Sequence, residues 1–122
     1  MKDDSSTTIQ ELKDLTESFV KEREWDKFHT PKDMAMNAII ELSELLDHFR
    51  FKETSEIVEL LNNPSYKAEI ANEFSDAFYS LLRLSDLLDI DMASELQTKL
   101  VEIGKKYPIE KAKGSNKKYN EL

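Results

Sequence analysis

The chain has 122 residues and no cysteine, so it is long enough for one domain and lacks both disulfide bonds and thiolate metal sites. Only two glycines and three prolines occur, and 34% of the residues are charged, a composition typical of long helices with few turns. No apolar run reaches the roughly 18 residues of a membrane span, and residues 1–6 lack the apolar core of a signal peptide. We therefore expect a cytoplasmic protein with no membrane partner.

Charge is distributed unevenly along the chain. Residues 1–98 carry 10 basic and 22 acidic side chains, whereas residues 99–122 carry seven lysines and three glutamates. A body with this negative charge repels nucleic-acid phosphates, so we expect no nucleic-acid partner. A phosphate-bearing small molecule would need bound cations, or the basic C-terminal segment, to offset the same repulsion.

The first two helices are predicted from capping residues and helical spacing of apolar side chains. Hydroxyl side chains at residues 5–8 precede an apolar pattern with helical period that runs to about Trp25. The second helix begins at Thr30-Pro31, an N-cap followed by proline at the first helical position, and ends near Arg50.

Two further helices are predicted in the second half of the chain. Residues 52–63 form a polar connection with one or two helical turns, and a break at 62–65 starts a long third helix that ends near Leu88. A fourth helix starts at Met92 and ends by Gly104 and Tyr107-Pro108. Four helices with short links and no alternating strand pattern predict an all-α, four-helix bundle-like subunit. We assign the helical domain to residues 1–108 and an irregular basic tail to residues 109–122.

Two acidic pairs interrupt the most apolar parts of the second and third helices. Glu41 and Glu44 form one pair, and Glu73 and Asp76 form the other. Because each pair has i, i+3 spacing, its two side chains lie on one helix face. No lysine or arginine follows at i+4 of Glu41 or Glu44, so the repulsion within this pair has no local compensation. Either pair, taken alone, is most simply explained as part of a solvated helix face. A solvated face and a functional site both stay open at this point.

Four clustered carboxylates favour a cation site. Oxygen ligands without histidine or cysteine select Mg²⁺, with Mn²⁺ as a possible substitute, over zinc. A carboxylate di-iron site would need Glu-x-x-His pairs, and the chain has none. We therefore expect a magnesium cofactor held by Glu41, Glu44, Glu73 and Asp76.

With these residues, the sequence resembles the MazG-like all-α nucleotide pyrophosphohydrolases, and most closely their dCTP pyrophosphatase branch. The four acids reproduce the family signature Glu-x-x-Glu, spacer, Glu-x-x-Asp, with 28 residues between Glu44 and Glu73. Further similarity lies in residues 22–31, which match an Arg-Asp-Trp-x-x-Phe-His run, in residues 81–84, and in the tail from Lys105 onward. The resemblance covers nearly the whole chain, from about residue 11 to the end.

The resemblance implies an activity and an assembly. The expected reaction is magnesium-dependent hydrolysis between the α and β phosphates of a nucleotide, most readily dCTP or a modified relative, to a monophosphate and pyrophosphate, in the service of nucleotide-pool sanitation. Glu41 or Glu44 would accept the proton of the attacking water. It also implies a homo-oligomer, with a tetramer favoured and a dimer possible, whose sites form where subunits meet.

The resemblance also implies residues that bind the substrate. Trp25, His29 and Phe51 match positions of the nucleobase pocket, and Lys99 matches a lysine that would hold the triphosphate. Ser80 and Arg83 continue the polar face of the third helix beyond Asp76 and complete the expected set, which is Trp25, His29, Phe51, Ser80, Arg83 and Lys99.

Three departures from the family pattern concern the substrate. Phe51 stands where relatives usually have tryptophan, Ser80 where the dCTP branch has tyrosine, and Ile103 where an asparagine is common. Tyr79 is one position from the expected tyrosine and so points about 100° away around the helix. Rival interpretations are a dUTP-type all-α hydrolase, a non-catalytic acidic helical interaction module, and an acidic regulatory partner of a toxin or nucleic-acid-binding protein.

Overall fold

The structure, a computed structural model, describes residues 1–122 and contains helices without strands. The elements are α1 (Ile9–Glu22), the 3-10 turn η1 (Asp26–Phe28), α2 (Pro31–Asp47), α3 (Thr54–Leu60), α4 (Pro64–Leu87), α5 (Met92–Lys106), α6 (Ile109–Ala112) and the 3-10 turn η2 (Tyr119–Glu121). The predicted all-α class is confirmed. None of these helices combines the length and the apolar character that a bilayer crossing requires.

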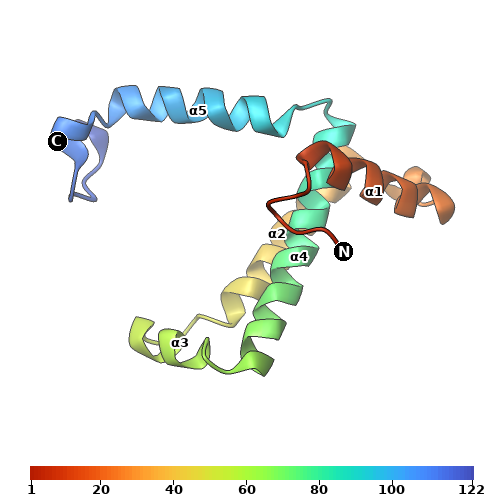
Figure 1. Cartoon of the computed structure of the whole chain (residues 1–122), viewed down its shortest axis with the longest axis horizontal. Coiled ribbons are helices and arrows are strands. Elements are labelled where there is room, and N and C mark those ends of the chain that lie inside the picture. Colours follow the sequence, from red (N-terminus) through yellow and green to blue (C-terminus); the bar gives the residue numbers. More distant parts are fainter. The chain divides into compact units, whose positions relative to one another are not determined.

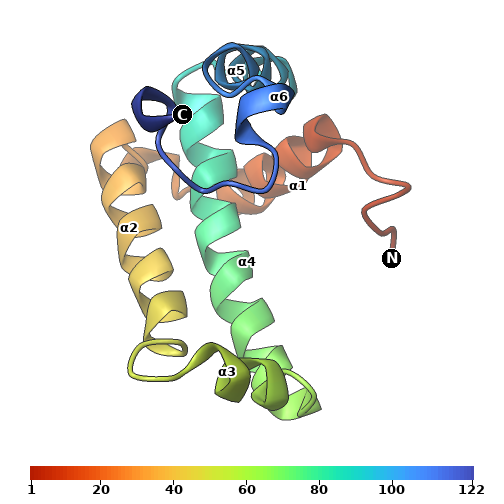
Figure 2. The same ribbon diagram turned by 90° about the vertical axis from the view of Figure 1, so that its left-hand side faces the viewer.

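Two compact units divide the chain, one at Met1–Asp89 and one at Ile90–Leu122. In the first unit α2 and α4 run antiparallel and side by side, and α1 packs against α4 (Figures 1 and 2). The connection at 52–63 contains α3, as predicted. The second unit consists of α5, α6 and η2. The predicted domain boundary at residue 108 stays a prediction.

The helix starts follow the capping chemistry of the sequence. The Thr8 and Thr30 hydroxyls accept the backbone N–H groups of Glu11 and Asp33 at 3.0 and 3.1 Å, and Asn63 caps α4 in the same way. Proline occupies the first turn of both α2 and α4. Each cap satisfies a backbone donor that the helix itself leaves unpaired.

The C-terminal segment differs from its predicted irregular form. Residues 109–112 form the short helix α6, and α5 continues through Gly104 to Lys106. Glycine lowers helix propensity by only about 1 kcal/mol, so a single glycine does not have to end a helix. Because α6 lies within residues 109–122, the prediction of a purely irregular tail was wrong in part.

The core of the first unit is small, and many apolar side chains remain exposed. The buried apolar residues are Val20, Met34, Ala38, Ala77 and Leu82. Apolar residues of α2 and α4 with more than a third of their surface exposed include Ile39, Leu42, Leu46, Phe74 and Leu81. Helical periodicity identifies an apolar face but does not say whether the same chain covers it.

A polar contact connects α2 to α4 inside the first unit. The Asn37 side-chain amide donates to the hydroxyl of Ser80 at 2.9 Å, and that hydroxyl donates to the Asp76 carbonyl at 3.2 Å. Ser80 is fully buried. Because a buried polar group that loses its partner keeps its full desolvation cost, this contact should stabilise the helix pair.

Ser80→Ala should lower the free energy of unfolding by about 1–2 kcal/mol, because it removes the acceptor of the Asn37 amide. Urea denaturation at a fixed protein concentration measures the change. Ser75→Ala on the same helix is the control, since the exposed Ser75 hydroxyl bonds only the Ala71 carbonyl of its own helix. We expect the control to change stability by less than about 0.5 kcal/mol. Equal losses in both variants would contradict a stabilising contact between Asn37 and Ser80.

Candidate active site

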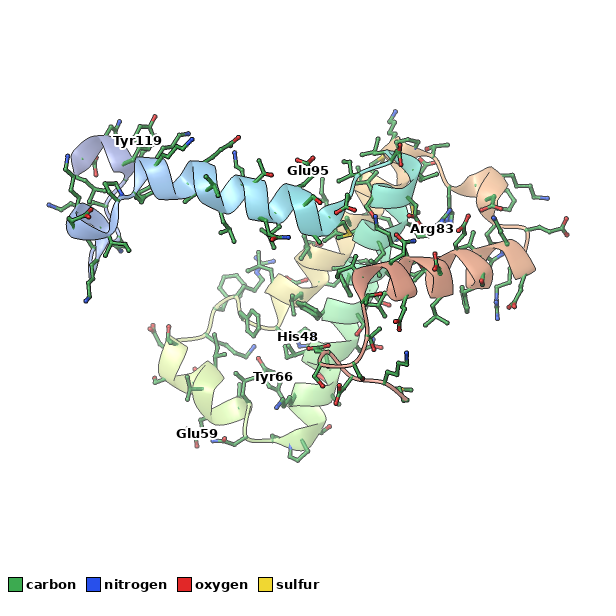
Figure 3. All side chains as sticks on the ribbon, turned by 45° about the horizontal axis from the view of Figure 1, so that its top comes forward. His48, Glu59, Tyr66, Arg83, Glu95 and Tyr119 are labelled. Atoms are coloured by element: carbon green, nitrogen blue, oxygen red, sulfur yellow. The ribbon has the colours of Figure 1, made fainter.

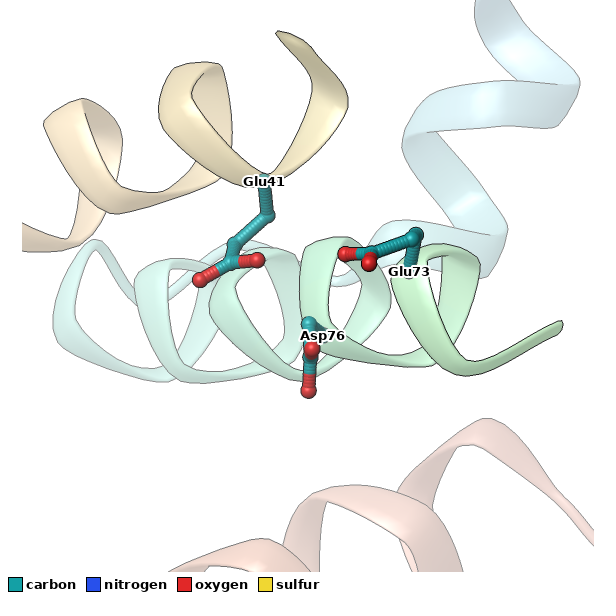
Figure 4. Close-up of side chains that lie close together, drawn as sticks. All are labelled: Glu41, Glu73 and Asp76. Carbon is teal, nitrogen blue, oxygen red and sulfur yellow. The ribbon is translucent and has the colours of Figure 1, made fainter. Parts of the chain in front are cut away.

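Pairing of α2 with α4 brings together the two acidic pairs of the sequence. α2 contributes Glu41, and α4 contributes Glu73 and Asp76 (Figure 4). A carboxylate oxygen from each of these three residues lies within 4.8 Å of the others. Glu73 and Glu41 are half-buried and Asp76 is exposed. Two helices far apart in sequence thus form one carboxylate cluster.

Glu44, the fourth acid of the motif, lies beside this trio. Its carboxyl group lies close enough to those of Glu41 and Glu73 to raise the pKa of both. It lies outside the set of three oxygens that approach one another most closely. The structure therefore brings all four predicted metal ligands into one neighbourhood, with Glu44 bridging the two helices.

The cluster carries uncompensated negative charge. Partial burial, followed by the carboxylates of Glu44 and Asp76, raises the pKa of Glu41 above its usual value. Partial burial, followed by the neighbouring carboxyl groups of Glu44 and Asp76, likewise raises the pKa of Glu73. No lysine or arginine forms an ion pair with any of the four acids, and the nearest basic group is His48, whose Nε2 lies 3.9 Å from Glu73.

This donor set fits a hard divalent cation. The ligands are carboxylate oxygens from two rigid helices, which are the groups that Mg²⁺ and Mn²⁺ prefer. A cation would also offset the mutual repulsion that, together with partial burial, raises the two pKa values.

An open pocket adjoins the cluster on the side where α4 begins. It has a volume of about 460 Å³ and is lined by His48, Ser65, Ala68, Glu69, Asn72 and Glu73. Tyr66 fixes this end of α2, since its hydroxyl donates to the His48 carbonyl at 2.7 Å and its ring contacts the His48 imidazole edge-on (Figure 3). Glu73 belongs to both the pocket and the carboxylate cluster, so a molecule in the pocket touches the cluster.

An aromatic group lies between α1 and α4. Trp25 meets Phe19 edge-on at a ring-centroid distance of 5.8 Å, and Phe19 meets Tyr79 at 6.4 Å. A smaller, apolar pocket of about 240 Å³ is lined by Leu15, Thr16, Phe19 and Tyr79. Tyr79 lies one helical turn after Asp76, so this pocket lies on the part of α4 that follows the cluster.

The end of α1 places Trp25. Glu24 adopts a left-handed backbone with φ of 53°, and the N–H groups of Glu24 and Trp25 bond the carbonyls of Lys21 and Val20. This Schellman arrangement normally uses glycine at the left-handed position. It reverses the chain so that the Trp25 ring folds back onto Phe19 of the helix just completed.

Sequence reasoning did not assign Phe19 and Tyr79 to a site. Phe19 follows the apolar spacing of α1, and it is 42% exposed. Tyr79 was set aside because it is one position from the family's tyrosine. Trp25, a predicted substrate residue close to Phe19 in sequence, was the one signal that Phe19 could belong to a site. Only the chain reversal brings the Trp25 ring onto Phe19.

The remaining predicted substrate residues occupy different environments. His29 is half-buried beside Arg83, whereas Ser80 and Arg83 are buried, with Arg83 only 4% exposed. Phe51 is 92% exposed on a left-handed backbone with φ of 63°, and the Arg50 guanidinium lies 4.4 Å from its ring centroid. Lys99 belongs to the second unit, where its ammonium contacts Glu102 at 3.2 Å.

Known proteins with a similar sequence or structure are pyrophosphatases. The chain is similar to dCTP pyrophosphatase 1 of Homo sapiens, with 28% identity over 115 residues that cover 94% of this chain and 68% of that protein. It is 27% identical to dCTP pyrophosphatase 1 of Bos taurus over 118 residues, which cover 97% and 70% of the two proteins. A pyrophosphatase from Archaeoglobus fulgidus has a similar structure, with a TM-score of 0.76 and 34% identity over 82% of this chain and 92% of that one.

The sequence model of the MazG-like family matches residues 37–122. This range covers most of the chain and includes all four carboxylates of the cluster. The chain therefore belongs to the MazG-like family.

Proposed function

We propose that this protein hydrolyses dCTP or a modified relative between the α and β phosphates, with Mg²⁺ as cofactor, to a nucleoside monophosphate and pyrophosphate. The general enzyme class has wider support than the choice of substrate and metal. The chain is an enzyme, a nucleoside triphosphate pyrophosphatase, in keeping with its family and with the pyrophosphatases that it resembles.

The observation that carries the proposal is the carboxylate cluster between α2 and α4. Its four acids have no lysine or arginine partner, and two of them have raised pKa values. A solvated acidic face would allow the side chains to spread apart in water, whereas these come from two helices and converge. Such convergence of like charges is typical of a functional site.

Each acid has a role in the proposed reaction. Glu41, Glu44, Glu73 and Asp76 supply the oxygen ligands of the cation. When bound, Mg²⁺ neutralises phosphate charge and makes a bound water more acidic. Glu41 or Glu44 accepts the proton of the attacking water at a carboxylate oxygen.

The nucleoside and the phosphates are assigned to other parts of the chain. We place the base near the aromatic group of Phe19, Trp25 and Tyr79, because nucleotide pockets are commonly lined by aromatic rings. His29 and Trp25 flank the same short turn, η1, so His29 is assigned to this end of the site, and Phe51 would complete the pocket where subunits meet. Lys99 and the basic C-terminal segment offer positive charge for the triphosphate. Nucleotide-pool sanitation is the proposed role, and a cytoplasmic location goes with it.

Incubation with a panel of canonical and modified nucleoside triphosphates, with and without Mg²⁺, should yield monophosphate and pyrophosphate only with metal. Ion-exchange chromatography of the products measures both. Preference for dUTP would favour the dUTP-type alternative. If circular dichroism shows that the protein is folded and no nucleotide gives product, the non-catalytic interaction module is favoured.

Glu44→Gln and Asp76→Asn should each lower turnover at least about a hundredfold, because each removes a charged ligand of the cation. Circular dichroism should retain the helical signal in both variants. Glu59→Gln is the control, since Glu59 is an exposed acid of α3 outside the cluster. Unchanged turnover in both cluster variants would contradict the assignment of the site.

Glu41→Gln should raise the melting temperature of the metal-free protein at neutral pH. A raised carboxyl pKa means that the folded state binds protons more tightly than the unfolded state, so stability is lost as pH rises through the folded pKa. The difference between wild type and variant should therefore shrink as pH falls toward the ordinary value of 4.5. Mg²⁺ should raise the melting temperature of wild type at pH 7 and that of the variant less.

Thermal scans in chelator, at a series of pH values, measure these differences. Glu59→Gln again serves as the control, and its melting temperature should follow wild type at every pH. A Glu41→Gln protein that is less stable than wild type at neutral pH would contradict the repulsion argument.

We also propose that the protein is a homo-oligomer, most simply a tetramer. The support is the exposed apolar surface of α2 and α4, where Ile39 and Leu46 are 69% and 60% exposed. Apolar patches of this kind on a small protein commonly mark an interface.

Ile39→Glu should lower the molar mass measured by light scattering after size exclusion, because it places a charge in the proposed interface. Ser55→Glu, an exposed polar position of α3, should leave the mass unchanged. A monomeric wild type across micromolar concentrations would contradict the proposal.

A further inference from the structure

Arg83 is a buried cation that the proposed chemistry does not use. It projects from α4 and is only 4% exposed, near the segment that follows α1 (Figure 3). Its Nε–H donates to His29 Nδ1 at 3.3 Å, and its Nη2 lies 3.5 Å from Asp26 Oδ1. Its Nη1 lies 3.8 Å from Asp86 Oδ2 on the same helix. The guanidinium therefore ties Asp26, the first residue of η1, and His29, the residue after it, to α4.

This environment leaves Arg83 little access to a ligand. Burying a charged guanidinium is costly unless partners surround it, and here three side chains do so. Asp86 Oδ2 is itself buried and accepts no hydrogen bond, so the Arg83 charge is its compensation. A residue held in this way is suited to placing its neighbours rather than to direct contact with a substrate.

The bond to His29 determines which imidazole nitrogen carries the proton. Arginine is a donor only, so His29 Nδ1 must be the unprotonated acceptor. The neutral ring then carries its proton on Nε2. Burial and the nearby Arg83 charge lower the pKa of His29, which favours this neutral form. Among the described contacts, His29 Nε2 has no protein partner within hydrogen-bonding distance.

We propose that Arg83 is a positioning residue for nucleoside recognition, which locks His29 in the neutral Nε2–H tautomer and anchors the η1 turn. His29, which flanks η1 together with Trp25, then offers one hydrogen-bond donor to an acceptor of the base such as a carbonyl oxygen or a ring nitrogen. The identity of the ligand rests on the proposed function, whereas the lock rests on the geometry of this chain. Arg83, which the sequence predicts to contact the substrate directly, would thus act on it only through His29.

The lock, meaning the hold of Arg83 on the His29 tautomer, can be tested without measuring enzyme activity. In ¹⁵N-edited spectra of the full-length protein, the His29 Nδ1 should have the shift of an unprotonated nitrogen and Nε2 that of a protonated one. Arg83→Lys keeps the charge but loses the Nε–H donor, so both tautomers should then be populated. A protonated Nδ1 in wild type, or an unchanged spectrum in Arg83→Lys, would overturn the lock.

Steady-state kinetics then test what the lock does. With dCTP, or with the nucleotide of the panel that is hydrolysed best, Arg83→Lys should raise KM about three- to tenfold, the usual effect of one weakened hydrogen bond. The value of kcat should stay near wild type, because the carboxylate cluster is unchanged. A merely structural role would instead lower the active fraction and hence kcat at constant KM.

Two variants of His29 distinguish the role of its Nδ1 from the role of its Nε2. His29→Gln can still present an N–H near the Nε2 position, whereas His29→Asn can satisfy Arg83 but presents no outer donor. We expect His29→Gln to keep a lower KM than His29→Asn. The reverse order would overturn the role of the Nε2–H donor.

A double-mutant cycle shows whether Arg83 acts through His29. Adding Arg83→Lys to His29→Asn should have little further effect on KM, because the group that Arg83 positions is already lost. Effects that multiply would mean that Arg83 contacts the nucleotide itself and would overturn the proposal.

Folding defects are controlled by two further variants. Arg83→Met leaves Asp86 buried and unpaired, so Arg83→Met with Asp86→Asn restores the charge balance and should fold while KM stays raised. Wild-type KM in this folded double variant would overturn the proposal. Lys67→Met, an exposed position of α4, should leave KM, kcat and the His29 spectrum unchanged. If wild type hydrolyses no nucleotide, the proposed function and the nucleoside role fall, and the spectrum still decides the lock.

Discussion

Mutual repulsion among four carboxylates is the constraint on which the rest of the first unit depends. Glu41 and Glu44 on α2 approach Glu73 and Asp76 on α4, and no lysine or arginine offsets them. The two helices must therefore be held together by contacts elsewhere along their length. Met34, Ala38, Ala77 and Leu82 supply buried apolar contacts, and the Asn37–Ser80 bond adds a directional one.

This arrangement separates the stabilising contacts from the candidate site. The buried residues lie toward the start of α2 and the end of α4, whereas the acids follow them on α2 and precede them on α4. Such a division is expected where function costs stability, because charge concentrated for a cation destabilises the protein that lacks it. The small core also leaves apolar surface exposed on both helices.

The two sides of the cluster differ in chemistry. Toward the start of α4 the open pocket is lined mostly by polar residue types, among them His48 and Glu73. Toward the end of α4 the aromatic group and the Arg83 network order the segment between α1 and α2. That segment is short, so one buried guanidinium, one Schellman reversal and the Thr30 cap are enough to orient Trp25 and His29. A rigid frame of this kind is what selective recognition of a small molecule requires.

The sequence by itself determined the all-α class, the capped starts of the helices and the identity of the four acids, because caps, apolar period and i, i+3 spacing are local properties. It also indicated the family, through motifs that can be read along the chain. Only the tertiary structure decided that Glu44 bridges two helices, that Phe19 and Tyr79 join Trp25, and that Arg83 is buried against His29. Those contacts join residues up to 60 positions apart in sequence, and no local pattern specifies which side chains of two amphipathic helices will meet.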